Sequence, residues 1–227
     1  MKRRQFTAAV STVGATAVGW AASAHAALGQ SDAAAGIRAA LERGAEAAVS
    51  ALGKPDGFLG NAKVRIPLPG FLADVAKLLK ATGQQKRVDE LVTAMNRAAE
   101  AAVPQAKALL VQAAKSMSME DALKIVRGPD NSVTEFFARK TRQPLGVQFL
   151  PIISRATERV ALADKYNAVA GKAAKLGLMK GEDADLNRYV TGKSLDGLYL
   201  MISEEERRIR KDPIGTGSEI LKKVFGR

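Results

Sequence analysis

The chain has 227 residues, and 35 Lys and Arg residues against 23 Asp and Glu residues give a formal net charge of +12 at pH 7. It contains no cysteine and a single histidine, His25, which excludes disulfides, the usual zinc and haem sites, and nucleophiles activated by histidine. Catalysis would therefore depend on carboxylates, lysine, tyrosine, serine or threonine, and we expect no cofactor and no metal site.

The first residues have the pattern of an export signal. A basic start that includes Arg3 and Arg4 is followed by a mildly apolar run over residues 10–22, and Ala24 and Ala26 match an A-x-A cleavage site. The apolar run is too short and too weak to span a membrane. The paired arginines also resemble a twin-arginine signal, with the general secretory route as the alternative.

This pattern divides the chain into a signal peptide, residues 1–26, and a mature part, residues 27–227, which is long enough for one domain with an adequate core. We predict an exported, periplasmic protein with no transmembrane segment in the mature part. Its excess of basic residues suggests an anionic partner: a lipid surface, a cell-wall polymer or an acidic protein. Nucleic acid is not expected in that compartment. The alternative is that the charges only keep a helical surface soluble.

The mature part is predicted to begin with a helix, a long loop and a second helix. Asp32 can cap a helix that runs to about Leu52. Residues 53–70 are too rich in glycine and proline for a helix, and Pro67 prevents a longer strand. Apolar side chains within this loop predict that it packs down on the helices, either as a functional loop or as a structural strap. A short helix over residues 71–81 follows.

Residues 84–116 are predicted to form the central helix. Apolar residues, most of them alanine, recur along it at steps of three and four, so neighbouring helices can approach it closely. Pro104 lies inside this stretch and should kink or break it, at a cost of about 3 kcal/mol unless neighbours compensate. Two helices, residues 84–102 and 104–116, are therefore the alternative.

Further helices are predicted in the second half of the chain, separated by glycine or proline. They cover residues 118–127, 132–140, 144–160, 164–176, 185–190, 194–211 and 218–225. We find no convincing strand, no heptad run and no internal repeat. The predicted fold class is all-α: a single-domain multi-helix bundle around a long Ala-rich central helix, with one long Pro/Gly-rich loop.

The stretch most informative about chemistry lies near the C-terminus. On a helix, Glu205 and Glu206 fall in or beside an otherwise apolar face. Neighbouring acids raise one another's pKa, which suits acid–base catalysis, with Arg97 or Tyr199 orienting a substrate. The alternative, which we favour, is that each glutamate pairs with an arginine of another helix, for which Arg97 is a candidate.

Asn96, Arg97 and Glu100 place three polar groups at or near the apolar face of the central helix. They could line a pocket that contacts a ligand. They could equally make hydrogen bonds between helices, which is the more common use of polar groups near a core.

Other candidates for contact with a ligand or partner lie in the long loop and at the C-terminus. Lys63 and Arg65 are the basic residues of the loop's possible extended segment, and Tyr199 is a polar aromatic of the last long helix. Lys222 and Lys223 belong to a basic amphipathic tail that could touch a membrane surface or dock onto the body of the protein.

Six motifs follow one another along the mature part. They are LGKP at residues 52–55, VRIPLP at 64–69, MNRAAE at 95–100, LDGL at 195–198, EEERRIR at 204–210 and LKKVFG at 221–226. In this order they resemble the exported bacterial family known as domain of unknown function 4197. The resemblance covers nearly all of the mature part. It implies an exported, mainly helical protein and supplies no activity.

The leading interpretation is an exported envelope protein with a binding or structural role and no catalytic activity, which contacts an anionic partner through its basic surface. The first alternative is a carboxylate-dependent hydrolase or lyase that uses Glu205 and Glu206. The second alternative is a carrier that holds an apolar ligand in a groove between helices.

Overall fold

A computed structural model describes residues 18–160, 163, 164, 166, 167, 170, 175 and 185–212, with side chains from residue 34 onward except those of Phe71, Val75, Leu78 and Leu79. Within these residues the chain is all-α, as predicted, and contains no strand. Its helices are α1 (Val18–Leu52), α2 (Gly70–Ala81), α3 (Gln85–Ala102), the 3₁₀ turn η1 (Val103–Gln105), α4 (Ala106–Lys115), α5 (Met119–Arg127), α6 (Ser132–Thr157) and α8 (Leu186–Lys211).

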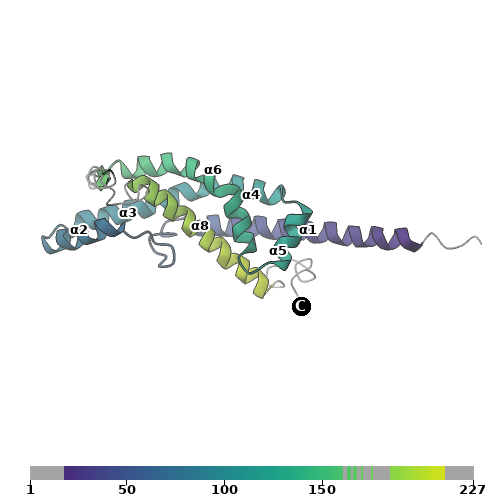
Figure 1. Cartoon of the computed structure of the whole chain (residues 1–227). Coiled ribbons are helices and arrows are strands. Elements are labelled where there is room, and N and C mark those ends of the chain that lie inside the picture. The colour runs from purple at the N-terminus through teal and green to yellow at the C-terminus, as the bar shows by residue number, and fades with distance from the viewer. Residues whose placement is uncertain are drawn as a thin grey trace, which may run out of the picture.

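The helices form an elongated bundle with α1 along its length (Figure 1). α6 packs against α3, α4 and α8, while α1 packs against α4, α5 and α8. α2 packs mainly on α3, and the two helices form one end of the molecule. The first part of α1, drawn in purple, extends past the other helices at the opposite end. The core therefore lies where α3 and α4 meet α6, α8 and the second half of α1.

The predicted central helix is broken at Pro104, as the two-helix alternative proposed. α3 ends at Ala102, and α4 begins at Ala106 after the single turn of η1. Val103 and Gln105, on either side of the proline, keep right-handed helical backbone angles, so α4 continues roughly where α3 ends. Proline has no backbone N–H to donate, and a tighter turn at this point accommodates that loss. The alanines on the inner face of this run are fully buried, which allows α6 and α1 to approach closely: Ala98, Ala99, Ala102, Ala106 and Ala114.

The predicted helix boundary at Pro144 is wrong, because α6 continues through both Pro144 and Pro151. Each proline frees the carbonyl four residues earlier, and these carbonyls belong to Lys140 and Val147. Both of those residues are exposed, as are the prolines themselves, so water can satisfy the freed carbonyls. The opposite face of α6 is buried against its neighbours, and this burial stabilises one continuous helix.

The predicted break at Gly192 is also wrong, because α8 is one helix that begins directly after Asp185. The Asp185 carboxylate accepts hydrogen bonds from the N–H groups of Asn187 and Arg188, as a helix N-cap does. A single glycine inside a helix costs about 1 kcal/mol. Fully burying one Val or Leu side chain contributes roughly 1.5–3 kcal/mol, so the buried Val190 and its apolar neighbours along α8 outweigh Gly192.

The predicted cap at Asp32 is wrong as well, because α1 already begins at Val18 and Asp32 lies inside it. Ala24 and Ala26, the predicted cleavage site, also fall within α1. Arg3, Arg4, Lys222 and Lys223 lie outside the described residues, as do the predicted helix over residues 218–225 and most of the one over residues 164–176. None of the helices that the structure describes is both long and apolar enough to span a membrane.

Candidate functional site

Residues 53–69, which connect α1 to α2, form a strap that is fixed at one point by Asn96 of α3. Asn96 is fully buried, and its side-chain oxygen accepts the N–H of Ile66 at 2.8 Å. Its amide nitrogen donates to the carbonyl oxygens of Ile66 at 3.0 Å and of Val92 at 2.8 Å. The amide thus pairs with both backbone groups of one strap residue, which would otherwise be buried without a partner.

Glu100, one helical turn after Asn96, fixes the strap at a second point. Its carboxylate is buried and accepts the N–H groups of Phe58 and Leu59, each at 3.0 Å. Arg97 donates to Glu100 at 2.7 Å and to Asp56 of the strap at 2.8 Å. These two hydrogen bonds, the one to Glu100 above all, raise the pKa of Arg97 above its ordinary value. The polar groups of α3 therefore bind the strap rather than another helix.

The strap is also held from the other side, by α8. A Cβ atom on Gly197 would lie 2.7 Å from the ring of Phe58, so glycine is required for the ring to pack there. The Tyr189 hydroxyl donates to the carbonyl oxygen of Pro67 at 3.1 Å, and Lys63 forms an exposed ion pair with Glu204 at 2.7 Å. The strap lies between α3 and α8 and is bound to both.

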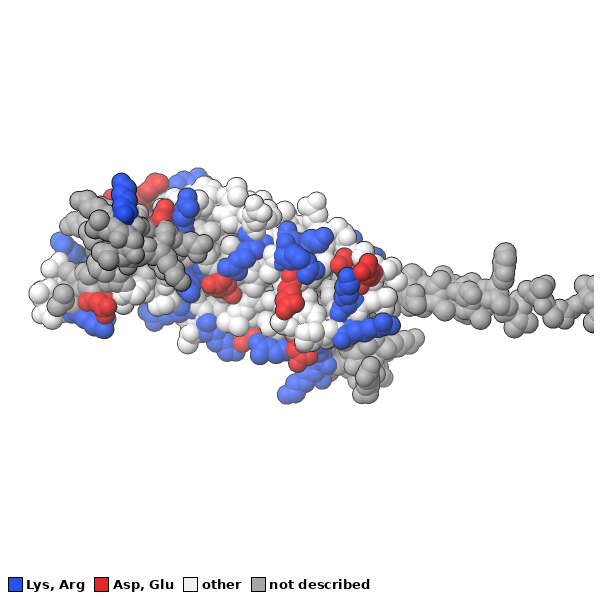
Figure 2. Space-filling view, viewed as in Figure 1, with Lys and Arg blue, Asp and Glu red and all other residues white. Residues whose placement is uncertain are grey.

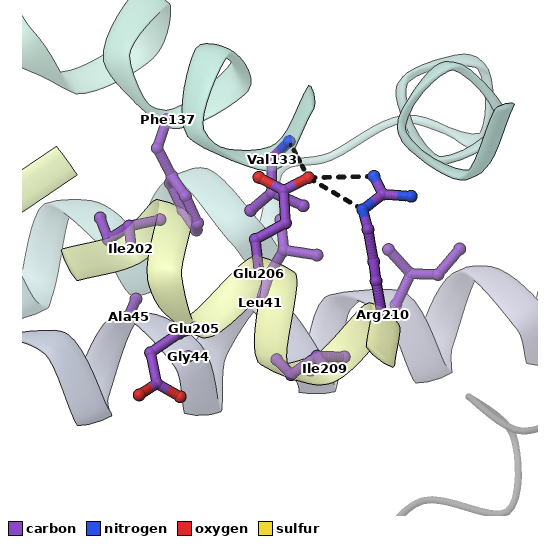
Figure 3. A pocket seen from close by; sticks show the side chains of 12 residues that line it. Leu41, Gly44, Ala45, Val133, Phe137, Ile202, Glu205, Glu206, Ile209 and Arg210 are labelled. Carbon is purple, nitrogen blue, oxygen red and sulfur yellow. Dashed lines mark hydrogen bonds and ion pairs between the residues drawn. The ribbon is translucent and has the colours of Figure 1, made fainter. Parts of the chain in front are cut away.

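Glu206 is the second buried glutamate, and from the neighbouring helix α8 it caps the first turn of α6 (Figure 3). It accepts the N–H groups of Val133 at 3.0 Å and Thr134 at 3.1 Å, which are two of the donors that a helix start leaves without partners. Asn131, at the N-cap position, makes no capping hydrogen bond with its side chain. Arg210 of α8 donates to Glu206 at 2.9 Å and to the carbonyl oxygen of Ile125 in α5. Glu206 of α8 thus caps α6, and Arg210 balances the negative charge of Glu206.

The structure does not bring Glu205 and Glu206 together as an acid–base pair. Their carboxylates point to opposite sides of α8 (Figure 3). Glu205 bonds to Arg208 of the same helix. The predicted partnership with Arg97 is wrong, because Arg97 bonds to Glu100 and Asp56 instead. The apolar cavity next to the two glutamates measures about 30 Å³, which leaves room for little more than a water molecule.

Tyr199, the other residue predicted to orient a substrate, lies in the core between α8 and α6. Its hydroxyl is 2.9 Å from that of Thr141, which itself donates to the carbonyl oxygen of Phe137. Tyr199 is therefore the donor in its bond with Thr141. The guanidinium of Arg142 lies 5.8 Å from the centre of the tyrosine ring. Burial raises the pKa of Tyr199 above its ordinary value.

A groove of about 440 Å³ lies beside the strap, between the strap, α2 and α3. Among the described side chains it is lined by apolar or small residues, by three basic residues, and by one acid and one hydroxyl: Pro67, Leu68, Ala73, Ala76, Val88 and Val92; Arg65, Lys77 and Lys80; Asp89 and Thr93. A volume in the range of about 300–1,000 Å³ is typical of ligand pockets. A second hollow of about 220 Å³ lies across the strap, against α8, and Arg65 and Pro67 line both.

The sequence pointed to part of this site. Lys63 and Arg65 were predicted contacts, and the structure places both on the strap, where Arg65 lies between the two hollows. Lys77 and Lys80 were missed. They stand three residues apart on α2, and only the packing of α2 on α3 brings them to the groove.

The family model described as "Protein of unknown function (DUF4197)" matches residues 27–226. The matched region contains all six motifs that carry the resemblance, and those that lie in the described part of the chain either belong to the strap or contact it. No match was found among curated proteins or among solved structures.

Proposed function

This chain belongs to the DUF4197 family of proteins of unknown function, and we propose that it is a non-catalytic binding protein of the cell envelope that contacts anionic lipid surfaces through its exposed basic residues. The observation that carries the proposal is a contrast in how its charges are used. Glu100 and Glu206, the buried carboxylates of the described part, are fully engaged in holding the fold. The excess of positive charge lies at the surface instead.

The basic surface supports contact with an anionic partner. Figure 2 shows Lys and Arg side chains spread along the face on which α6 and α8 lie, from the α2 end toward the α5 end, with fewer acidic ones among them. Such a charge excess attracts anionic surfaces over a distance set by the ionic strength, about 8 Å under physiological conditions. Anionic lipid is the partner of this kind that every bacterial envelope contains in quantity.

The envelope location is a proposal that the N-terminal residues support. Arg3, Arg4 and the A-x-A sequence of Ala24 and Ala26 fit an export signal. The region matched by the family model begins at residue 27, directly after the predicted cleavage site.

Co-sedimentation of the full chain with vesicles tests this function. We expect the protein to pellet with phosphatidylglycerol vesicles at low salt and not with phosphatidylcholine vesicles. At about 1 M salt the Debye length falls to about 3 Å, so much less protein should pellet with the anionic vesicles. The apolar run of residues 10–22 could insert into either lipid, but such insertion would be insensitive to salt and to lipid charge. Equal pelleting with both lipids, or pelleting unaffected by salt, would contradict the proposal.

The enzymatic alternative gains no support from the geometry. Glu206 is surrounded by its own hydrogen-bond donors, and Glu205 bonds to Arg208 on the other side of the helix. The cavity that both line measures about 30 Å³, which is far smaller than a typical ligand pocket. The described geometry therefore favours the groove over the glutamate face as the place where a ligand binds.

A further inference from the structure

We propose that the groove between the strap, α2 and α3 binds a single-chain anionic amphiphile, with the anionic head at Arg65 and the chain along the apolar wall. This inference rests on the proposed function and names the ligand of one site within it. Its basis is the combination, in one groove, of an apolar wall, basic lining residues and a volume of about 440 Å³.

The wall of the groove suits a hydrocarbon chain. α2 contributes the small residues Ala73 and Ala76, which leave space, while α3 contributes Val88 and Val92. Leu68 of the strap closes the groove on the third side. An apolar chain that enters would remove these surfaces from water, and this burial favours binding.

The charges around the groove favour an anion. Arg65 and Lys80 take part in no ion pair within the part of the chain that the structure describes, whereas Lys77 is already paired with Asp74 at 2.9 Å. Asp89 is the one acid among the described lining residues, and it would repel an anionic head placed beside it.

The position of Asp89 decides where the head lies. Asn96, which is bonded to the strap next to Arg65, stands seven residues after Asp89 on α3. A helix rises 1.5 Å per residue, so the two are about 10 Å apart along the axis. The head therefore lies toward Arg65, where Thr93, one turn before Asn96, offers a hydroxyl.

The strap makes Arg65 a fixed anchor. Ile66, its neighbour in the chain, is held by two hydrogen bonds with Asn96, and the carbonyl oxygen of Pro67, the next residue, accepts a hydrogen bond from Tyr189. The backbone that carries Arg65 is thus positioned before any ligand arrives, which reduces the entropy lost on binding. α2 forms the outer wall and packs mainly on α3.

Titration calorimetry of the full chain with decyl phosphate, below its micelle concentration, tests the groove. We expect saturable binding of one molecule and much weaker binding of decanol or inorganic phosphate, because the site needs both head and chain. Decanoate should bind as well if the head group is read only by its charge. Decyl phosphate binding no stronger than that of inorganic phosphate would overturn the proposal.

Two variants assign the binding to this groove. Arg65→Gln should weaken decyl phosphate binding about fivefold to tenfold through loss of one hydrogen bond from an exposed side chain. Ala73→Leu should weaken it by filling the apolar wall. Lys115→Gln, the same change of charge at the exposed end of α4, should alter binding less than about twofold. Thermal melts check that each variant is folded. Binding unchanged in both groove variants would overturn the assignment.

The vesicle experiment and the calorimetry experiment test the two proposals independently, because either can give a negative result without the other. Salt-sensitive pelleting with anionic vesicles, but no binding of decyl phosphate, would overturn the groove and leave the membrane-surface function standing. Decyl phosphate binding that depends on Arg65, but no pelleting, would overturn that function while supporting the groove as the site of a free amphiphile.

Discussion

Two buried glutamates of this protein bind backbone N–H groups in a similar way, but their surroundings differ. Glu100 accepts two consecutive backbone N–H groups of the strap and pairs with Arg97. Glu206 accepts two consecutive N–H groups at the start of α6 and pairs with Arg210.

The difference lies in what adjoins each anchor. The strap that Glu100 and Asn96 fix borders a groove of about 440 Å³, whereas Glu206 borders a cavity of about 30 Å³. A buried, charged side chain is therefore a poor guide to function by itself. The open space next to the element that it holds is the better guide, and it points to the strap.

The largest effect is expected at the α6 anchor. Glu206→Ala would remove the carboxylate that accepts from two N–H groups of α6 and pairs with Arg210, and breaking such a buried pair costs about 3–5 kcal/mol. Urea denaturation measures this loss in the free energy of unfolding. Glu205→Ala is the matched control, since the more exposed pair with Arg208 contributes no more than about 1 kcal/mol. Equal losses in the two variants would refute the capping role of Glu206.

A smaller, more local effect is expected at the strap. Asn96→Ala would leave the N–H and carbonyl groups of Ile66 buried without partners, at a cost of about 1–3 kcal/mol for each group that water does not reach. Hydrogen exchange should then be faster at the Ile66 amide and unchanged at Val133. Decyl phosphate binding should weaken, because Arg65 loses its fixed backbone. Unchanged exchange at Ile66 would show that Asn96 does not hold the strap.

Overpacking tests the contact of the strap with α8. Gly197→Ala would bring a Cβ atom to 2.7 Å from the Phe58 ring and should destabilise the protein by about 1–3 kcal/mol. Gly44→Ala is the control inside α1, because its Cβ would meet Ile209 and Glu205 at ordinary distances, 3.7 and 3.8 Å. It should stabilise the protein by about 0.5–1 kcal/mol through helix propensity. Thermal melts of both variants that shift in the same direction would contradict the described packing.

The smallest effect concerns Tyr199, which lies on α8 between Gly197 and Glu206. Its folded-state pKa is raised by burial, so it stays protonated above the pH at which the unfolded chain releases this proton. Its contribution to stability is therefore complete below about pH 10, the ordinary tyrosine pKa, and is lost as the pH rises through the higher folded value. Tyr199→Phe should lessen the fall in stability between about pH 9 and 11, as measured by urea denaturation. An identical fall in the stability of the wild-type protein and of Tyr199→Phe would contradict the raised pKa of Tyr199.

The fold class could be predicted from the sequence because apolar residues recur at helical spacing along most of the chain. The boundaries at Pro144 and Gly192 could not, because they depend on which face of the helix meets water and on how much the neighbouring residues bury. A proline on the exposed side of α6 and a glycine flanked by buried apolar residues in α8 are tolerated, which composition alone does not reveal.

Some residues of the candidate site could be predicted from the sequence, but their hydrogen-bond partners could not. Asn96, Arg97 and Glu100 were identified from their place at or near an apolar helix face, yet their bonds go to a strap some 30 to 40 residues earlier in the chain. Lys77 and Lys80 had no distinguishing signal, since lysines on an amphipathic helix are common. Their relevance follows only from the groove that α2, α3 and the strap form together.

The most direct test of the central claim, that ligand binding occurs at the strap and not at the glutamate face, is to titrate decyl phosphate into two variants of the full chain. Arg65→Gln should weaken binding about fivefold to tenfold, and Glu205→Gln should leave it unchanged, with similar melting temperatures for both. Loss of binding in Glu205→Gln and normal binding in Arg65→Gln would place the ligand on the glutamate face and contradict the claim.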